Sequence, residues 1–238
     1  MKRINLLVTV FILFFNAIPF FGSFANNHNS ISNQANIPDS LRDRQFLYNG
    51  TEWKNEFRRI DGDQFLFTNL FMPGSVTFNG RTFINIQIRY DIFSDEIMIP
   101  RSLDQIIILN KEMVDSFYFV FDNNLYKFKK INEDTLREPK GYVNVLYDGK
   151  SALYVKYVKR ISTEISDDSD GRFYQVYTIY FVKDGIPFQV TGMKDLYRIL
   201  ENEKNNLREF IKKNRLKVTR KLPESFVPVI RYYDSLSK

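Results

Sequence analysis

The sequence contains no cysteine and a single histidine, and these absences exclude much of the chemistry that proteins carry out. Without cysteine there is no disulfide, thiolate nucleophile, iron–sulfur cluster, covalently attached haem or cysteine-based zinc site. The histidine, His28, lies in a polar segment for which we predict no fixed structure. A catalytic triad needs an imidazole held rigidly beside its nucleophile, so His28 is not expected to serve one. No cofactor is predicted.

The sequence also lacks a glycine-rich phosphate-binding motif and any alternation of strands with helices, which excludes a nucleotide-binding fold. A calcium site is the nearest approach to a metal motif. Ser166, Asp168 and Asp170 have the spacing of a calcium-binding loop, but the twelfth position, which should be a bidentate glutamate, is Tyr177. We therefore interpret this segment as a solvated acidic turn.

The amino-terminal residues have the pattern of a secretory signal. Lys2 and Arg3 precede an apolar run over residues 6–15, and small residues at Ser23 and Ala25 offer a cleavage site. The alternative is a retained membrane anchor, which needs about 20 apolar residues. A proline and a glycine just before the cleavage site favour removal. We predict that residues 1–25 are a cleaved signal peptide and that no transmembrane segment follows.

The remaining chain divides by composition. Residues 26–44 are polar and lack periodicity, which predicts a disordered leader. The chain has 23 Phe and 14 Tyr, which suit strands, and turn signals recur between short apolar runs over residues 45–190. Helical periodicity replaces them over 191–238. The predicted fold is mainly β with α: an antiparallel β-meander (curved sheet, sandwich or barrel) followed by two or three C-terminal amphipathic helices packed on the β body.

The strongest local signal is a hairpin at Asn79-Gly80, because this pair supplies the positive φ angles of a type I′ turn. The strand that leaves the turn alternates apolar and polar residues. One face is predicted to be buried and the other to be wet. The buried face comprises Ile84, Ile86, Ile88 and Tyr90, and the wet face comprises Asn85, Gln87 and Arg89.

The net charge of +6 belongs to the C-terminal region, where residues 191–238 hold 12 Lys/Arg and 6 Asp/Glu. Such a basic stripe is typical of contact with an anionic surface. The alternative is an exposed helix face that keeps the protein soluble. Nucleic acid is not an expected partner of an exported chain. The candidate contacts are Lys204, Arg208, Lys212, Lys213, Arg215 and Lys217.

Two further sets of residues are candidates for chemistry. Paired carboxylates would be enough for glycoside hydrolysis, and the candidates are Asp61, Asp63, Asp91, Asp95 and Glu96. Several of these lie in predicted turns, where aspartate is expected anyway. Three Asp–hydroxyl–aliphatic triplets are similar to an O-glycosylation sequon of exported bacterial proteins, with Ser40, Thr135 and Ser235 as acceptors.

Several stretches resemble a group of uncharacterised exported proteins of Bacteroidetes-type bacteria. They are PGSV at residues 73–76, NG at 79–80, IRYDIFSD at 88–95, FIKKN at 210–214 and YYD at 232–234. The resemblance implies an envelope location, and it carries no known catalytic residues.

From the residues, the first hypothesis is a non-enzymatic envelope protein that acts as a binding or interaction module, with an envelope protein or a glycan as partner. The expected location is the periplasm, the outer membrane or the outside of the cell. The alternatives are a glycan- or peptidoglycan-directed hydrolase that uses acidic residues, and an anionic-surface binder that uses the basic C-terminal helices.

Overall fold

The computed structural model describes residues 44–131, 139–162 and 170–236. In these ranges the chain forms twelve strands, which are joined in one sheet. The strands are β1 (Thr51–Glu52), β2 (Ile60–Asp61), β3 (Met72–Phe78), β4 (Arg81–Asp91), β5 (Glu96–Pro100), β6 (Ile106–Ile108), β7 (Val114–Phe121), β8 (Asn124–Ile131), β9 (Gly141–Asp148), β10 (Ala152–Ser162), β11 (Gly171–Lys183) and β12 (Ile186–Val190).

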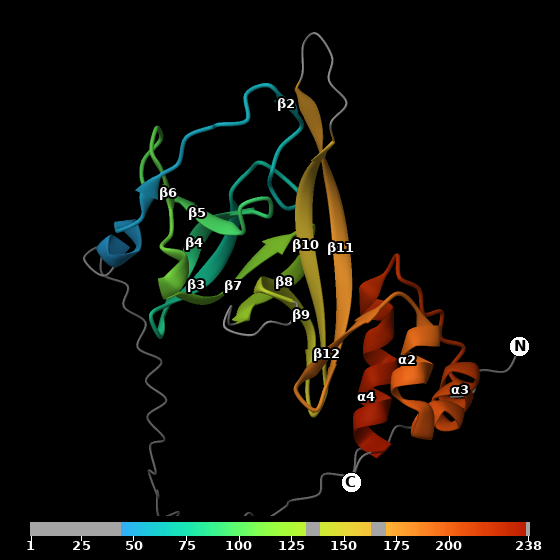
Figure 1. Cartoon of the computed structure of the whole chain (residues 1–238). Coiled ribbons are helices and arrows are strands. Elements are labelled where there is room, and N and C mark those ends of the chain that lie inside the picture. The colour runs from blue at the N-terminus through green and yellow to red at the C-terminus, as the bar shows by residue number, and fades with distance from the viewer. Residues whose placement is uncertain (1–43, 132–138, 163–169, 237–238) are drawn as a thin grey trace, which may run out of the picture. The chain divides into compact units, whose positions relative to one another are not determined.

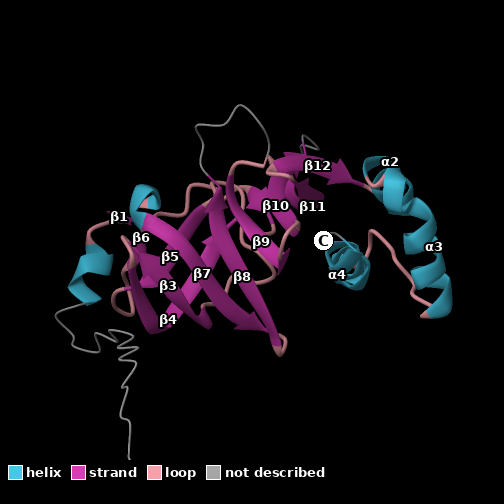
Figure 2. Ribbon diagram, turned by 90° about the horizontal axis from the view of Figure 1, so that it is seen from below, coloured by secondary structure: helices cyan, strands magenta, loops and turns pink. Residues whose placement is uncertain are grey.

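The sheet is two antiparallel meanders joined through β3. The first runs from β3 to β6 and the second from β7 to β12, and β3 pairs with both β4 and β7. β1 extends the sheet beyond β6, and β2 pairs in parallel with the start of β11. The sheet is not closed, and it is curved (Figures 1 and 2). The predicted mainly-β meander with C-terminal helices is confirmed, as an open sheet.

Local turn chemistry sets the hairpins. The φ angles are +50° and +74° at Asn79 and Gly80, and +48° and +58° at Asp122 and Asn123. Asn, Asp and Gly reach such left-handed conformations at the least cost, so they form the tight turns that suit twisted strands. The predicted hairpin of β3 and β4 is therefore confirmed.

The predicted wet face of β4 is wrong at Arg89, which is only 7% exposed. The register of β3 against β4 shifts between Gly74 and Val76, and Asn85 adopts a φ of +55°. Such a bulge re-aims the residues around it. The Arg89 guanidinium lies among aromatic rings, 4.1 Å from the Phe65 centroid and 4.7 Å from that of Trp53.

An aromatic cluster fills the core on one face of the sheet. The Phe117 and Phe128 rings are stacked with centroids 4.7 Å apart, and Tyr90 lies edge-on to both. Aromatic pairs contribute about 0.5–1.5 kcal/mol beyond their burial. These three rings pack across β4, β7 and β8 and so join the three strands through their side chains.

Three α-helices follow β12 in the described C-terminal segment: α2 (Met193–Ile199), α3 (Lys204–Lys213) and α4 (Val227–Leu236). α4 lies between the sheet and the other two helices (Figures 1 and 2). Tyr233 packs edge-on against Phe181 of β11, and Tyr232 stacks on Phe210 of α3 with centroids 4.1 Å apart. Short 3₁₀ helices occur at Gln45–Tyr48 (η1), Lys111–Met113 (η2), Glu201–Glu203 (η3) and Pro223–Phe226 (η4).

Within the described ranges, no helix is both long and apolar enough to cross a membrane.

Candidate functional site

A groove of about 580 Å³ lies between the second meander and the C-terminal segment. Four neighbouring strands and the start of η4 contribute to its walls, and we call it the tyrosine groove. Its volume is within the range of small-ligand sites. It is lined by Asn124, Leu125, Tyr126, Asn144, Val145, Leu146, Tyr157, Gln175, Tyr177, Lys221, Leu222, Pro223 and Glu224.

Three tyrosines give the groove an aromatic wall. Tyr157 of β10 and Tyr177 of β11 are cross-strand partners with ring centroids 6.1 Å apart. Phe67 packs between two of the tyrosines, 4.6 Å from the Tyr126 centroid and 5.9 Å from that of Tyr157. Phe67 holds a φ of +65°, which is rare for a bulky residue and persists only where the surroundings enforce it. The aromatic wall is therefore held in place from behind.

The most informative polar group in the groove is the Asn144 side chain. Asn144 is 2% exposed, and its Nδ2 atom makes no hydrogen bond of regular geometry with the described residues, although the amide acts on the Tyr157 hydroxyl and lowers its pKa. An unpaired buried donor costs about 1–3 kcal/mol, so such an atom calls for an explanation. Because Asn144 lines the groove, a ligand acceptor is one way to satisfy it.

The Tyr157 hydroxyl remains neutral in the groove. Burial raises the pKa of Tyr157 well above its ordinary value, and the neighbouring Asn144 amide opposes this shift only in part. A neutral hydroxyl both donates and accepts hydrogen bonds. The groove also contains the exposed amide of Gln175, together with Lys221 and Glu224, whose charges balance.

Hydrogen bonds attach the C-terminal wall of the groove to β11. The Tyr177 hydroxyl donates to the Arg220 carbonyl at 2.9 Å, and the Arg220 guanidinium donates to the Tyr177 carbonyl at 3.4 Å. The same guanidinium lies over the Tyr177 ring, 5.7 Å from its centroid. These contacts fix the start of η4 opposite the strands.

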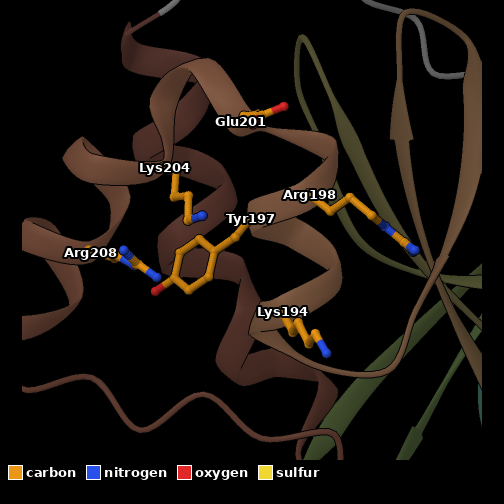
Figure 3. Close-up of a pocket in the computed structure, with 6 residues that line it drawn as sticks. All are labelled: Lys194, Tyr197, Arg198, Glu201, Lys204 and Arg208. Atoms are coloured by element: carbon orange, nitrogen blue, oxygen red, sulfur yellow. The ribbon is translucent and has the colours of Figure 1, made fainter.

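A second concavity, of about 540 Å³, lies on α2 and α3, and we call it the basic pocket (Figure 3). It brings together two of the predicted anionic-surface contacts, Lys204 and Arg208. The other four, Lys212, Lys213, Arg215 and Lys217, are exposed but do not line it. The sequence reasoning missed three lining residues on α2: Lys194, Tyr197 and Arg198.

The five candidate carboxylates are separated by the fold into different environments. Asp61 is exposed and lies 3.5 Å from Arg172, whereas Asp63 Oδ1 accepts a hydrogen bond from the Phe65 amide at 2.9 Å. Asp91 and Glu96 are cross-strand partners in the hairpin of β4 and β5. Both line a pocket of about 340 Å³ whose walls include Trp53 and Phe57. The chain thus brings one acidic pair together.

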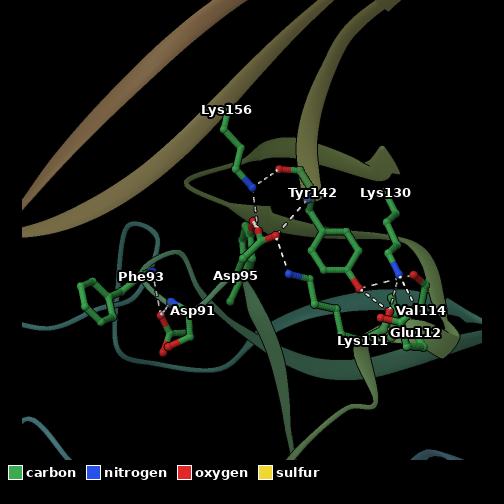
Figure 4. Close-up of polar contacts among 11 residues, drawn as sticks. Asp91, Phe93, Asp95, Lys111, Glu112, Val114, Lys130, Tyr142 and Lys156 are labelled. Carbon is green, nitrogen blue, oxygen red and sulfur yellow. Dashed lines mark hydrogen bonds and ion pairs between the residues drawn. The ribbon is translucent and has the colours of Figure 1, made fainter. Parts of the chain in front are cut away.

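The Asp91 carboxylate accepts hydrogen bonds from the turn that follows it. It is 2% exposed, and Oδ1 accepts hydrogen bonds from the amides of Phe93 and Ser94 at 2.8 and 2.9 Å (Figure 4). Burial raises its pKa from 3.8 to about 6, although these hydrogen bonds oppose the shift. A buried carboxylate that caps its own turn has a structural role, so this pair is a weak candidate for catalysis.

The Asp91 pKa predicts that stability falls between acid and neutral pH. An unfolded aspartate titrates near pH 3.9, so between about pH 4 and 6 the folded chain holds a proton that the unfolded chain has released. Above pH 6 the raised pKa lowers the free energy of unfolding by about 3 kcal/mol, which corresponds to roughly two pKa units. Asp91→Asn keeps the acceptor oxygen and removes the titration. In urea unfolding, the free energy of unfolding of the variant relative to wild type should rise by about 2–3 kcal/mol between pH 4 and 7. Parallel pH profiles would refute this role of Asp91.

Asp95 lies at the centre of an ionic network between the two meanders (Figure 4). Its carboxylate contacts the Lys156 ammonium at 2.8 Å and the Lys111 ammonium at 3.2 Å. It also accepts hydrogen bonds from the Tyr90 hydroxyl at 2.5 Å and the Tyr142 amide at 3.3 Å. Burial alone would raise the pKa of Asp95, but Lys156, Tyr90 and Lys111 hold it below its usual value. Asp95 is therefore an ionised structural anchor.

A second carboxylate joins α4 to the turn between β9 and β10. Asp234 is 8% exposed and accepts hydrogen bonds from the Ser151 amide at 3.0 Å, the Ser151 hydroxyl at 2.7 Å and the Tyr147 hydroxyl at 2.9 Å. Asp234 begins one of the predicted glycosylation triplets. The acceptor of that triplet, Ser235, is exposed and donates to the Tyr232 carbonyl at 2.6 Å.

Some predictions fall on residues outside the described ranges. These are the signal peptide at 1–25, the leader up to residue 43, His28, the acceptors Ser40 and Thr135, and Ser166 and Asp168 of the acidic turn. Asp170 of that turn is described, and it forms an exposed ion pair with Arg59 at 2.8 Å. Among the described residues, no three His, Asp or Glu side chains come together as ligands for a metal ion.

No protein-family model, curated protein or solved structure shows significant similarity to this chain.

Proposed function

We propose that this protein is an exported, non-enzymatic binding module of the cell envelope, and that the tyrosine groove binds a neutral glycan. The export part of the proposal rests on the charge and apolar pattern of residues 1–25. The glycan part rests on the groove, and above all on the buried Asn144 Nδ2 atom, which makes no hydrogen bond of regular geometry with the described residues.

The chemistry of the groove suits a sugar. The faces of tyrosine rings accept the C–H faces of pyranose rings, and their hydroxyls add polar contacts at the edge. Amides such as Asn144 and Gln175 both donate to and accept from sugar hydroxyls. Lys221 and Glu224 carry opposite charges, so neither a strong anion nor a strong cation is favoured. A neutral, hydroxyl-rich ligand matches this combination.

Binding is favoured over glycan hydrolysis by the state of the acidic pair. Glu96 has a raised pKa caused by burial, as Asp91 has, and both face a pocket with aromatic walls. This arrangement is what supports a hydrolase as the second candidate function. Asp91, however, is buried and bound to two backbone amides, whereas a general acid or nucleophile must reach the substrate.

The test is Asn144→Leu, which replaces the amide with an apolar side chain of similar volume. Because the removed donor makes no hydrogen bond of regular geometry in the free protein, the variant should melt at about the same temperature as wild type. Glycan affinity should fall by about 10- to 100-fold, as expected for the loss of one desolvated hydrogen bond. Affinity is measured by calorimetry, with glycans first selected from a neutral oligosaccharide array.

The matched control is Asn205→Leu, the same change at an exposed position of α3 outside the groove. It should leave affinity unchanged. Equal affinity of Asn144→Leu and wild type, or an array without any neutral glycan bound, would refute the groove. The protein is recovered from an exporting host, and its intact mass reports whether residues 1–25 are removed and whether sugars are attached to Ser40, Thr135 or Ser235.

A further inference from the structure

We propose that the basic pocket on α2 and α3 binds a phosphate-bearing anion, independently of the tyrosine groove. The pocket is lined by Lys194, Tyr197, Arg198, Glu201, Lys204 and Arg208, which comprise four cations, one carboxylate and one aromatic ring. A concave surface of about 540 Å³ with this excess of positive charge concentrates anions.

The cations are arranged in two pairs at helical spacing. Lys194 and Arg198 are four residues apart on α2, and Lys204 and Arg208 are four residues apart on α3. Like charges at this spacing destabilise a helix by about 0.2–0.5 kcal/mol per pair. The protein bears this repulsion on two adjoining helices, and the attraction of both cations to a bound anion would offset it.

Carboxylates do little to neutralise the pocket. Among the described residues, none lies within 4.0 Å of the charged nitrogens of Lys194, Lys204 or Arg208. Arg198 lies 3.3 Å from Asp195, but that carboxylate also accepts two hydrogen bonds from Thr191. The net charge of the lining is +3, so an anion is the ligand that it favours.

Tyr197 orients the central part of the pocket. The Arg208 guanidinium lies over its ring, 5.2 Å from the centroid, and the Lys204 side chain extends toward the same ring (Figure 3). A guanidinium held on an aromatic face loses less freedom on binding, and its fork of donors matches phosphate oxygens. In the same view Glu201 points away from Lys204 and Arg208, and Lys194 and Arg198 lie on the other side of the ring. Lys204 and Arg208 thus form the centre of the site, with Lys194 and Arg198 at its rim.

This geometry distinguishes binding in a defined pocket from diffuse attraction to the whole basic surface. Lys212 and Lys213 lie on α3 as well, but neither lines the pocket. Diffuse attraction would depend on all of these charges alike, whereas a site depends on Lys204 and Arg208. Two phosphate sources share the required chemistry: a soluble oligophosphate and the headgroup of an anionic lipid.

The test compares two double variants that remove the same charge from α3. K204Q/R208Q empties the centre of the pocket, and K212Q/K213Q is the matched control. One arm measures inorganic tripolyphosphate binding by calorimetry. The other measures sedimentation with vesicles of equal parts phosphatidylcholine and phosphatidylglycerol. We expect K204Q/R208Q to weaken binding by about 10- to 100-fold, from the loss of two charge-assisted contacts, and the control to weaken it by less than about threefold.

The two arms identify the source. A pocket-dependent effect with tripolyphosphate alone supports a soluble ligand, and one with vesicles alone supports a lipid headgroup. Equal losses in both double variants, or no binding of wild type in either arm, would overturn the proposal. All four replaced residues are on the protein surface, so the melting temperatures should match, and glycan binding in the tyrosine groove should be unchanged in both variants.

Discussion

Replacing Asp95 with asparagine is expected to lower the free energy of unfolding by about 3–5 kcal/mol, because the ammonium groups of Lys111 and Lys156 then lose their charged partner, although Lys156 keeps its hydrogen bond to the Tyr142 carbonyl. The side chains of Asp95 and Lys156 are only 18% and 14% exposed, so water cannot compensate fully. The backbone is not the cause of the loss, since asparagine tolerates the φ of +59° at this position as well as aspartate does. Urea unfolding at neutral pH measures the change.

The pH dependence of this effect has a defined sign. The pKa of Asp95 is lowered in the folded state, so its stabilisation is present above the unfolded pKa, near 3.9, and is lost as the pH falls through the folded value. Wild type and Asp95→Asn should therefore converge in acid. The control is Asp184→Asn in the exposed turn between β11 and β12, which should change stability by less than about 0.5 kcal/mol. A loss at neutral pH as small as that of the control would contradict the anchoring role.

Asp234→Ala is expected to cost about 3 kcal/mol and to loosen the C-terminal helices. The change leaves the Ser151 amide and the hydroxyls of Ser151 and Tyr147 without their acceptor. Ser151 is 4% exposed, and each unpaired buried donor costs about 1–3 kcal/mol, whereas the half-buried Tyr147 can turn its hydroxyl to water. Because one wall of the tyrosine groove comes from residues 221–224, directly before α4, glycan affinity should fall together with stability. Hydrogen exchange of residues 193–236 measures the loosening.

Ser235→Ala is the matched control for this prediction. Ser235 follows Asp234 in α4, but it is exposed and its hydroxyl donates only to a backbone carbonyl of its own helix. It should therefore cost less than about 0.5 kcal/mol. If the amides of residues 193–236 exchange as slowly in Asp234→Ala as in Ser235→Ala, the carboxylate does not hold the helices on the sheet.

The hairpins were predictable because their causes are local. Asn79-Gly80 and Asp122-Asn123 adopt positive φ angles. Asn, Asp and Gly favour these angles by themselves, whatever the rest of the fold is. Arg89 was mispredicted because its environment is not local. Its burial follows from a bulge in the pairing of β3 with β4 and from aromatic residues, such as Trp53, that lie far away in the sequence.

The same distinction applies to the sites. Lys204 and Arg208 were found by charge, and Lys194 and Arg198 carried the same four-residue spacing and were missed. The tyrosine groove had no comparable signal. Its residues come from four strands and η4, and only the register of the sheet brings Asn144 beside the aromatic wall.

At one end of the described sheet, β12 pairs on one side with β11 and has no neighbour on the other. Its second residue is Pro187, which offers no N–H to either side. α2 begins three residues after the strand ends at Val190. A strand from a second chain could not form a continuous row of backbone hydrogen bonds along this edge. The edge therefore disfavours polymerisation by strand addition.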